Sequence, residues 1–379
     1  MSRPLVVLAA GGTGGHMFPA AALAQALSRR GLAIALVTDR RGGAFALPDG
    51  DLAVHRVRAA AMAGASFAAK AKAGIQLLVG TAQAWLLLRR LKPAVVVGFG
   101  GYASIPAVMA AHRLGLPIVL HEQNAVLGRA NRLVASYARR IATGFAEVEG
   151  IAAADRPKLA HTGNPVRPEV IALASQPYPA FTADGGLNML VTGGSQGASL
   201  FSRVIPEAIR LLPEGMRRRL KLVQQVRADD LDAVRAVYAS IGFEAELSPF
   251  FADLPQRLAT AHLAIGRAGA STIAETAVAG RPAILVPYAA ATDDHQTKNA
   301  RALESAGAAI VMPEAAFTAE ALAARLQPML ALPDKLRSMA SAARTVGIVD
   351  AAERLADLVL ATAPANGNDS TKTAGRSAA

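Results

Sequence analysis

Residues 5–20, LVVLAAGGTGGHMFPA, contain the change of pattern that decides the fold. The run Leu5 to Ala10 is short, apolar and rich in β-branched residues, which predicts a buried strand. Four of the five residues at 11–15 are glycine, and the segment 20–31 has strong helix formers that end in basic residues and a glycine. The glycines therefore form a strand-to-helix turn. Its bare N–H groups, at the positive end of the helix dipole, can receive an anion, and His16 is predicted to stand in that turn.

The same strand–glycine–helix unit recurs midway along the chain. A strand from Asn188 to Thr192 runs into Gly193, Gly194 and Gly197, and a third strand that begins at Ala94 also ends in glycines before a helix. Further apolar strands, separated by helical stretches, are predicted at 33–38, 117–122, 220–226, 262–267 and 282–288. This alternation predicts an α/β fold of two doubly wound, Rossmann-like parallel-sheet domains, whose ligands bind off the carboxyl ends of the strands, in the cleft between the domains.

The length of 379 residues favours two domains. The proline-bearing turn HTGNPVRPEV at 161–170 predicts the boundary, with an N-terminal domain at 1–165 and a C-terminal domain at 166–349. A helix over 350–363 is predicted to pack back on the N-terminal domain, and the small, polar tail at 364–379 is predicted to be disordered.

Composition and charge limit the classes of molecule that this protein could bind. The formal net charge of +12 calls for an acidic partner, but dispersed basic residues and only 4% aromatics weaken the case for nucleic acid. The absence of cysteine excludes disulfides and thiol catalysis, and the seven histidines have no metal-ligand spacing. The N-terminus lacks a signal-peptide pattern, which predicts a cytoplasmic protein. The longest apolar helical stretch, Gly74 to Lys92, is predicted to be too short and too interrupted to span a bilayer, although it could lie on one.

A nicotinamide-dependent dehydrogenase is one alternative for the glycine turn. Asp39 follows the second strand, where a ribose-binding carboxylate would sit. The dinucleotide fingerprint that starts at Gly12, however, has Met17 where its third glycine belongs. No GKS or GKT follows any glycine run either, so both the dehydrogenase and the P-loop interpretations are disfavoured.

Seven segments occur in an order that one known family shares. They are GGTGGHMFPA, VVGFGGYASIPA, HEQNAVLGRAN, TGNPVR, TGGSQGA, RAGASTIAETAVAGRPAILVPY and DDHQTKNA. Up to about Ala361 the chain closely resembles the MurG family, the UDP-N-acetylglucosamine:undecaprenyl-pyrophosphoryl-muramoyl-pentapeptide N-acetylglucosaminyltransferases of peptidoglycan synthesis. The resemblance implies a GT-B fold and an inverting transfer that needs no metal or other cofactor. The sugar would pass from UDP-N-acetylglucosamine to the C4 hydroxyl of the lipid-linked muramoyl-pentapeptide (lipid I), forming lipid II.

The resemblance also implies the location and the partners. The enzyme would be a peripheral protein on the cytoplasmic face of the bacterial inner membrane, serving cell-wall biogenesis, cell shape and cell division. Its partners would be the two substrates, the anionic inner leaflet and other cell-wall synthesis proteins, with no nucleic acid.

The residues that the resemblance assigns to the donor come from both halves of the chain. They are Thr13, Gly14, Gly15, Asn124, Arg167, Ser195, Phe251, Ala270, Ser271, Glu275 and Gln296. Ser195 and its neighbouring glycines would meet the pyrophosphate, the alternative being an ordinary tight turn. Glu275 would accept from the ribose hydroxyls, the alternative being a carboxylate that only complements a helix dipole. The backbone of Phe251 would recognise uracil.

Amide side chains suit a sugar because an amide donates and accepts at once. Gln296 and Asn124 would contact the donor sugar from different domains, and His295 could share the role given to Gln296. Arg167 would contact the nucleotide at the domain junction, a plain surface arginine being the alternative.

A separate set of residues is predicted to bind the acceptor. The residues that would cradle the lipid-linked pyrophosphate are Gly14, Gly15, His16, Gly101, Tyr102 and Ser104, together with Thr13 and Gly100. His16 is the candidate general base, since a neutral imidazole can take the proton of the attacking hydroxyl. The alternatives are a histidine that holds an anion in the loop and one that merely packs at the start of a helix.

One helix is the candidate for membrane contact. Its apolar residues are Leu77, Leu78, Val79, Trp85, Leu86 and Leu87, flanked by Lys70, Lys72, Arg89 and Arg90. A plain buried helix is the alternative.

Two other functions stay open from the sequence: a UDP-N-acetylglucosamine 2-epimerase of the same fold, and a membrane-docked scaffold without activity.

Overall fold

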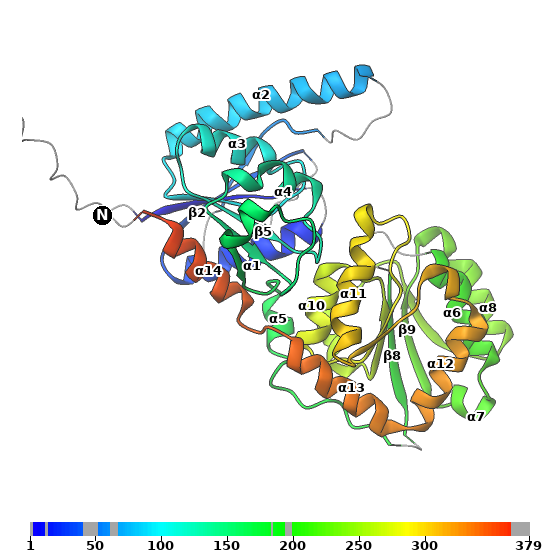
Figure 1. Ribbon diagram of the computed structural model, residues 1–379. Helices are drawn as coiled ribbons and strands as arrows, with labels where there is room; N and C mark the ends of the chain where they lie inside the picture. The colour runs from blue at the N-terminus through cyan, green and yellow to red at the C-terminus, as the bar shows by residue number, and fades with distance from the viewer. Residues whose placement is uncertain are drawn as a thin grey trace, which may run out of the picture.

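Two parallel β-sheets, one in each half of the chain, organise the computed structural model, which describes residues 3–11, 14–40, 52–60, 67–182, 185–193 and 199–364 (Figure 1). The first sheet has seven strands in the order β3-β2-β1-β4-β5-β6-β7, and the second has six in the order β10-β9-β8-β11-β12-β13. In each sheet the first strand lies inside and later strands are added on both sides of it, which is the doubly wound pattern. The predicted pair of Rossmann-like sheets is confirmed.

The strands are short and all their pairings are parallel. Those of the first sheet are β1 Leu5–Ala9, β2 Ala33–Thr38, β3 Ala53–Arg56, β4 Val95–Gly98, β5 Ile118–Glu122, β6 Arg140–Thr143 and β7 Leu159–His161. Those of the second are β8 Leu187–Thr192, β9 Leu220–Gln225, β10 Ala245–Ser248, β11 Leu263–Gly266, β12 Ala283–Leu285 and β13 Ala309–Val311.

Helices cover both faces of each sheet. In the first half they are α1 Gly14–Arg29, α2 Phe67–Leu91, α3 Ile105–Arg113 and α4 Arg129–Val134, followed by α5 Pro168–Ile171 at the crossing to the second half. In the second half they are α6 Ser199–Leu211, α7 Glu214–Arg217, α8 Leu231–Ser240, α9 Leu254–Thr260, α10 Ala270–Val278, α11 His295–Ser305, α12 Ala319–Ala331 and α13 Pro333–Val346. The last helix is α14 Ala351–Thr362.

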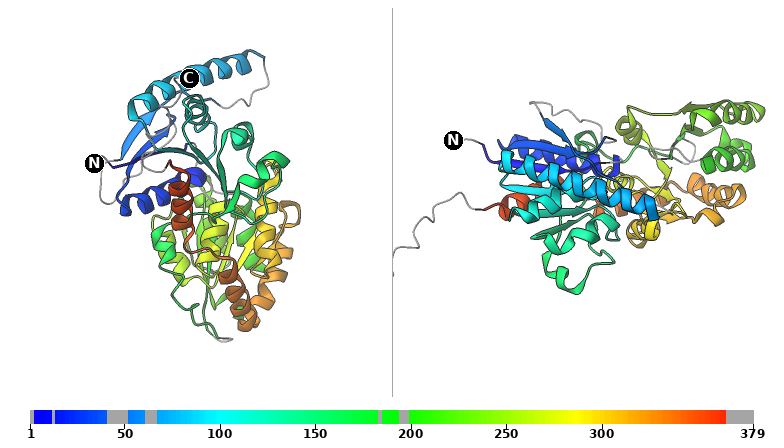
Figure 2. Two further views of the ribbon diagram at one scale, coloured as in Figure 1. Left: turned by 60° about the vertical axis from the view of Figure 1, so that its left-hand side comes forward. Right: turned by 90° about the horizontal axis from the view of Figure 1, so that it is seen from above.

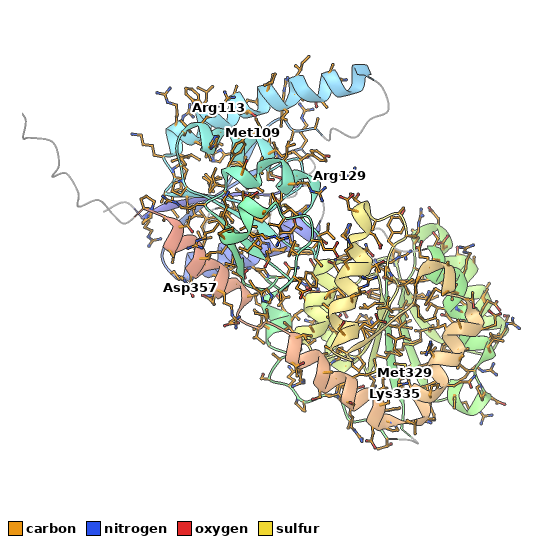
Figure 3. The ribbon with its side chains drawn as sticks, in the orientation of Figure 1. Met109, Arg113, Arg129, Met329, Lys335 and Asp357 are labelled. Carbon is orange, nitrogen blue, oxygen red and sulfur yellow. The ribbon has the colours of Figure 1, made fainter. Side chains whose placement is uncertain are left out.

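Helix α14 leaves the second half and packs on the first (Figures 1 and 2). Leu355 and Val359 are buried in the same apolar cluster as Leu23 and Leu27 of α1. On the rim, Arg30 pairs with Glu353 and with Asp357, each at 2.6 Å, and Figure 3 labels Asp357 on this helix. We propose that 1–165 together with 350–363 forms one folding unit and 166–349 the other.

The chain therefore crosses between the halves twice, and the two crossings touch. Gly163, just before α5, has a φ of +82°, and a Cβ placed on it would lie 2.8 Å from Cβ of Ile348, between α13 and α14. Only glycine fits this position, because both the left-handed backbone and the close approach exclude a side chain.

The helix α2 corrects one prediction. It runs for 25 residues, so the stretch expected to be too short for a bilayer is long enough. Ala71–Leu91 has a mean hydropathy of 1.2 with 22% of it buried, and by length and composition alone it could cross a membrane. It nevertheless packs on the first half. Ala84 and Leu88 are buried there, and Gly80 lies so close to the backbone carbonyl of Arg58 that no side chain would fit.

Candidate functional site

His16 lies in the first turn of α1, which begins at Gly14 directly after the glycine turn. Its ring is half-buried, and its Nδ1 lies 2.9 Å from Oε1 of Gln123, just after β5. Gly101 follows β4 with a φ of +69°, and a Cβ there would lie 3.4 Å from Nε2 of His16. A larger residue at this position would cover that nitrogen, so glycine leaves the Nε2 side of the imidazole open.

Ser104 and Tyr102 belong to the same loop as Gly101. Ser104 is fully buried, and its hydroxyl donates to the carbonyl of Gly101 at 2.9 Å. This bond shapes the glycine loop from behind, while Tyr102 and Gly101 are partly exposed. Of the predicted acceptor residues, the structure thus places His16, Gly101 and Tyr102 at the surface of the site and Ser104 beneath it.

Glu122 has a place that the sequence analysis missed. Its buried carboxylate accepts from the backbone N–H of Asn124 at 3.0 Å and of Gly128 at 2.9 Å. It also accepts from the side-chain amides of Asn124 at 3.1 Å and Asn131 at 2.8 Å. Four donors on one carboxylate fix the loop after β5, and with it Asn124.

Asn299 of α11 joins the two halves at Asn124. It is fully buried, and its Oδ1 accepts from the backbone N–H of Ala125 at 2.8 Å. Its Nδ2 donates to Oδ1 of Asn124 and to the carbonyl of Ala268, both at 3.1 Å. The side-chain amide of Asn124 thus donates through Nδ2 to Glu122 and accepts through Oδ1 from Asn299. It retains one N–H and one lone pair for a sugar.

Arg167 forms a second junction between the halves, and Glu275, in the same half as Arg167, holds its side chain in place. Nε and Nη2 of Arg167 donate to the two carboxylate oxygens of Glu275 at 2.7 and 2.8 Å, a bidentate pair. Burial alone would lower the pKa of Arg167, but the hydrogen bonds and the charge of Glu275 outweigh it and raise that pKa. The Arg167 guanidinium also lies 5.5 Å from the ring centroid of Phe18, two residues after His16 in α1. The helix that carries His16 is therefore connected to Glu275 through Phe18 and Arg167.

The N-terminus of α10 contains an unpartnered polar group. The helix begins at Ala270, and the Oγ of Ser271 is buried with no hydrogen-bond partner in the described part of the chain. A buried hydroxyl without a partner beside free helix N–H groups is the environment that a phosphate oxygen satisfies. Two other predicted phosphate contacts, Thr13 and Ser195, lie outside the described residues.

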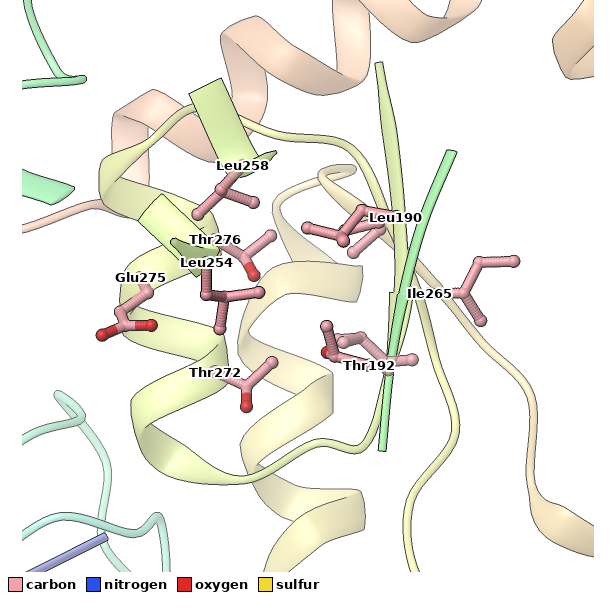
Figure 4. A pocket seen from close by; sticks show the side chains of 12 residues that line it. Leu190, Thr192, Leu254, Leu258, Ile265, Thr272, Glu275 and Thr276 are labelled. Atoms are coloured by element: carbon pink, nitrogen blue, oxygen red, sulfur yellow. The ribbon is translucent and has the colours of Figure 1, made fainter. Parts of the chain in front are cut away.

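A small cavity lies behind α10, against β8 and β11 (Figure 4). Its volume is about 40 Å³, which holds a few water molecules at roughly 10–15 Å³ each and no nucleotide. Leu190, Leu258 and Thr276 line it, while the carboxylate of Glu275 points away from it (Figure 4). The carboxylate of Glu275 thus faces Arg167 rather than this cavity.

Phe251 lies in the turn before α9. It is buried, with the guanidinium of Arg257 at 4.3 Å from its ring centroid. Arg257 is in turn held by Glu246 at 2.6 Å and Asp253 at 2.8 Å. The side chain of Phe251 thus packs inward, an arrangement that leaves recognition to its backbone.

Gln296 and His295 begin α11. Oε1 of Gln296 accepts from the backbone N–H of Tyr288 at 3.0 Å, so its amide nitrogen is the group left to donate to a ligand. Nδ1 of His295 lies 2.7 Å from the carbonyl of Thr292, which makes Nδ1 the protonated nitrogen. Close by, Arg129 of α4 (labelled in Figure 3) lies 3.4 Å from Asp293 and adds a third contact between the halves.

Among the residues that the structure describes, no group of three or more His, Asp or Glu side chains could hold a metal ion.

Comparisons with known proteins identify the family of the chain. The family described as Glycosyltransferase family 28 N-terminal domain matches residues 6–143, and the Glycosyltransferase family 28 C-terminal domain matches residues 188–355. A Rhodospirillum centenum protein is 56% identical over 96% of both chains, and a Paramagnetospirillum magneticum protein is 52% identical over 96% of this chain and 98% of its own. Both are named UDP-N-acetylglucosamine--N-acetylmuramyl-(pentapeptide) pyrophosphoryl-undecaprenol N-acetylglucosamine transferase.

Solved structures extend the comparison to the fold. The crystal structure of Acinetobacter baumannii MurG has a TM-score of 0.75 and 29% identity, covering 94% of this chain and 99% of its own. UDP-GlcNAc 2-epimerase from Neisseria meningitidis, bound to UDP-GlcNAc, has a TM-score of 0.64 at 13% identity over 95% of this chain and 100% of its own, a likeness of fold alone. With relatives above 50% identity along nearly its whole length, the chain belongs to the MurG family of GT-B N-acetylglucosaminyltransferases.

Proposed function

We propose that this chain transfers N-acetylglucosamine from UDP-N-acetylglucosamine to the C4 hydroxyl of lipid I, forming lipid II, at the junction of its two halves. The observation that carries the proposal is the contact of Arg167 with both Phe18 and Glu275. Through it, the helix that carries His16 meets the helix whose N-terminus suits a nucleotide. An epimerase is not favoured, because the solved epimerase shares the fold at only 13% identity.

The donor would lie along the N-terminus of α10. The orphan hydroxyl of Ser271 and the first N–H groups of the helix would hold the pyrophosphate, with Ala270 leaving room for it. Glu275 would accept from the ribose hydroxyls while Arg167 keeps it oriented. Gln296 would donate to the sugar from α11, and Asn124 would contact it from the first half.

The acceptor would enter on the side of Gly14, Gly15 and Gly101. The small residues let the lipid-linked pyrophosphate and its sugar come close to the backbone, and Tyr102 lines the same loop. His16 would then take the proton of the C4 hydroxyl as that oxygen attacks the anomeric carbon and UDP leaves. We propose that no metal takes part, since helix N–H groups and Arg167 offer positive charge to the leaving UDP.

The helix α2 would rest on the cytoplasmic face of the membrane. Ile75, Leu78 and Leu86 are between 62% and 69% exposed, a high value for large apolar side chains. Arg89 and Arg90 are exposed at the end of the same helix, where they can meet anionic lipid. The helix is thus only partly buried, with one apolar side packed on the first half and another open to solvent.

The test is incubation of the protein with UDP-N-acetylglucosamine, labelled in the sugar, and lipid I. The expected result is label on the lipid product in step with the release of UDP. Release of UDP without sugar on the lipid would contradict the proposed transfer. His16→Ala should lower kcat by roughly a hundredfold or more, the scale of general-base catalysis, with the KM for UDP-N-acetylglucosamine nearly unchanged.

A further inference from the structure

A buried chain of hydrogen bonds runs behind His16 into the first sheet. Nδ1 of His16 lies 2.9 Å from Oε1 of Gln123, and Nε2 of Gln123 lies 2.9 Å from Nδ1 of His121. The other ring nitrogen of His121, Nε2, lies 3.3 Å from the backbone carbonyl of Gly163. Gln123 and His121 are 2% and 0% exposed, so water does not compete for these bonds.

The backbone decides which way the amide of Gln123 faces. Its Nε2 donates at 3.0 Å to the carbonyl of His121, and a carbonyl oxygen can only accept. The reversed amide would place two oxygens against each other in a buried site. The NH₂ group therefore faces His121 and the amide oxygen faces His16.

The tautomer of His121 follows from the same logic. The carbonyl of Gly163 requires a proton on Nε2 of His121, so Nδ1 is the acceptor for Gln123. Burial lowers the pKa of His121 to about 4, an effect that the neighbouring His16 reinforces. The ring is therefore neutral at physiological pH, as a lone pair on Nδ1 requires.

The fixed orientation of the Gln123 amide determines which ring nitrogen of His16 carries the proton. We infer that Gln123 and His121 are positioning residues that hold neutral His16 with its proton on Nδ1 and its lone pair on Nε2, the nitrogen beside Gly101. The amide oxygen of Gln123 can only accept, so Nδ1 of His16 must donate to it. A neutral imidazole has one N–H, which leaves Nε2 unprotonated.

The consequence for catalysis rests on the proposed function. A lone pair at Nε2 accepts the proton of the C4 hydroxyl as the bond from that oxygen to the anomeric carbon forms. The bond from the anomeric carbon to the phosphate oxygen breaks at the same time, and its electron pair leaves with UDP. A histidine in water prefers the opposite tautomer, with its proton on Nε2, which would present an N–H where a base is needed.

Imidazole ¹⁵N NMR of the full-length protein tests the inference without any substrate. His16, assigned from its missing signal in His16→Ala, should show a pyrrole-like Nδ1 and a pyridine-like Nε2 at a pH where it is neutral. His262 supplies the opposite reference in the same spectrum. Its Nδ1 accepts from the N–H of Asn188 at 2.8 Å, and its Nε2 donates to the carbonyl of Ala180 at 3.1 Å. A neutral His16 with its proton on Nε2 would overturn the inference.

Two variants separate the relay from simple packing. Gln123→Met keeps the length of the side chain and removes the acceptor, so His16 should lose its fixed tautomer while His262 keeps its own. His121→Asn keeps an oxygen near the position of Nδ1 that can still accept from Gln123, so the tautomer of His16 should survive. An unchanged His16 spectrum in Gln123→Met would overturn the inference, and the wild-type measurement decides it even where a variant does not fold.

Turnover separates failure of the relay from failure of the proposed function. In Gln123→Met we expect kcat to fall roughly tenfold to a hundredfold, the loss typical when a partner that orients a histidine is removed, with an unchanged KM for UDP-N-acetylglucosamine. If the tautomer is lost and kcat stays at the wild-type value, the relay stands and the base role of His16 fails. If the wild-type tautomer is the opposite one, the relay fails whatever the turnover.

Discussion

Protonation of His121 should by itself destabilise the first half of the molecule when the pH is lowered from 7 to 4. The folded protein holds this ring neutral with a pKa of about 4, against 6.5 for a histidine in the unfolded chain. Between these two values the unfolded chain binds a proton that the folded protein does not. The stabilisation that neutral His121 contributes is therefore fully present above about pH 6.5, decreases as the pH falls below that value, and stops decreasing below about pH 4.

The size of the effect follows from the difference of pKa. A shift from 6.5 to 4 is 2.5 units, and at 1.36 kcal/mol per unit the loss is about 3 kcal/mol. His121→Asn cannot titrate, so its free energy of unfolding should change with pH by that much less than the wild-type value. The carboxylates and the other six histidines are present in both proteins, so their contributions to the pH dependence cancel in the comparison.

The single tryptophan makes this loss measurable in one half of the chain. Trp85 packs against the apolar cluster that contains Leu120, next to His121 in β5. Urea unfolding followed by tryptophan fluorescence at pH 7, 5.5 and 4 therefore reports on the first sheet. Wild-type and His121→Asn curves that shift in parallel over this range would show that His121 is not held neutral and would refute the reasoning.

Three further results are expected. Glu275→Ala should raise the KM for UDP-N-acetylglucosamine roughly tenfold to a hundredfold with little change in kcat, because hydrogen bonds to a carboxylate contribute about 1.5–3 kcal/mol equally before and during the reaction; a lower kcat at unchanged KM would contradict the ribose role. Arg89→Gln combined with Arg90→Gln should weaken binding to anionic vesicles roughly thirtyfold at about 1 kcal/mol per charge. The exposed control pair Arg218→Gln and Arg235→Gln should leave flotation unchanged, and equal losses in both pairs would argue against docking through α2. Transfer should continue in EDTA, and activity that returns only with added Mg²⁺ would contradict metal-free transfer.

Most of the central strands were predictable from sequence and the edge strands were not. The predicted strand at 33–38 coincides with β2, and those near β1, β4, β5, β8, β9, β11 and β12 differ mostly by a residue or two at their ends. The strands β3, β6, β7, β10 and β13 were missed, and all of them except β6, which lies between β5 and β7, are at sheet edges. An edge strand is half exposed, as the AVHR of β3 shows, so it lacks the continuous apolar run that marks a buried parallel strand.

The site was predictable where a residue belongs to a local motif. His16 lies in the first turn of α1 and Glu275 one turn into α10, the two helices that Phe18 and Arg167 connect, although the roles of both residues stay predictions. Gln123 and Asn299 were missed, because each acts through a partner more than 100 residues away in the chain. The alternation in HEQN was the available signal, since neighbouring residues at a strand end face opposite ways. This alternation places His121 and Gln123 on the side of the His16 imidazole, and Glu122 on the side of the loop that carries Asn124.

The return of α14 to the first sheet bears on the order in which the protein is made. Residues 1–165 leave the ribosome first, but the apolar cluster around Leu23 and Leu27 of α1 is complete only when Leu355 and Val359 have been synthesised. By then every strand and helix that the structure describes in the second half has already been synthesised. The half that is translated first is thus the half that finishes folding last, and a ribosome that stops before codon 350 releases a chain with a complete second half and an open apolar face on the first.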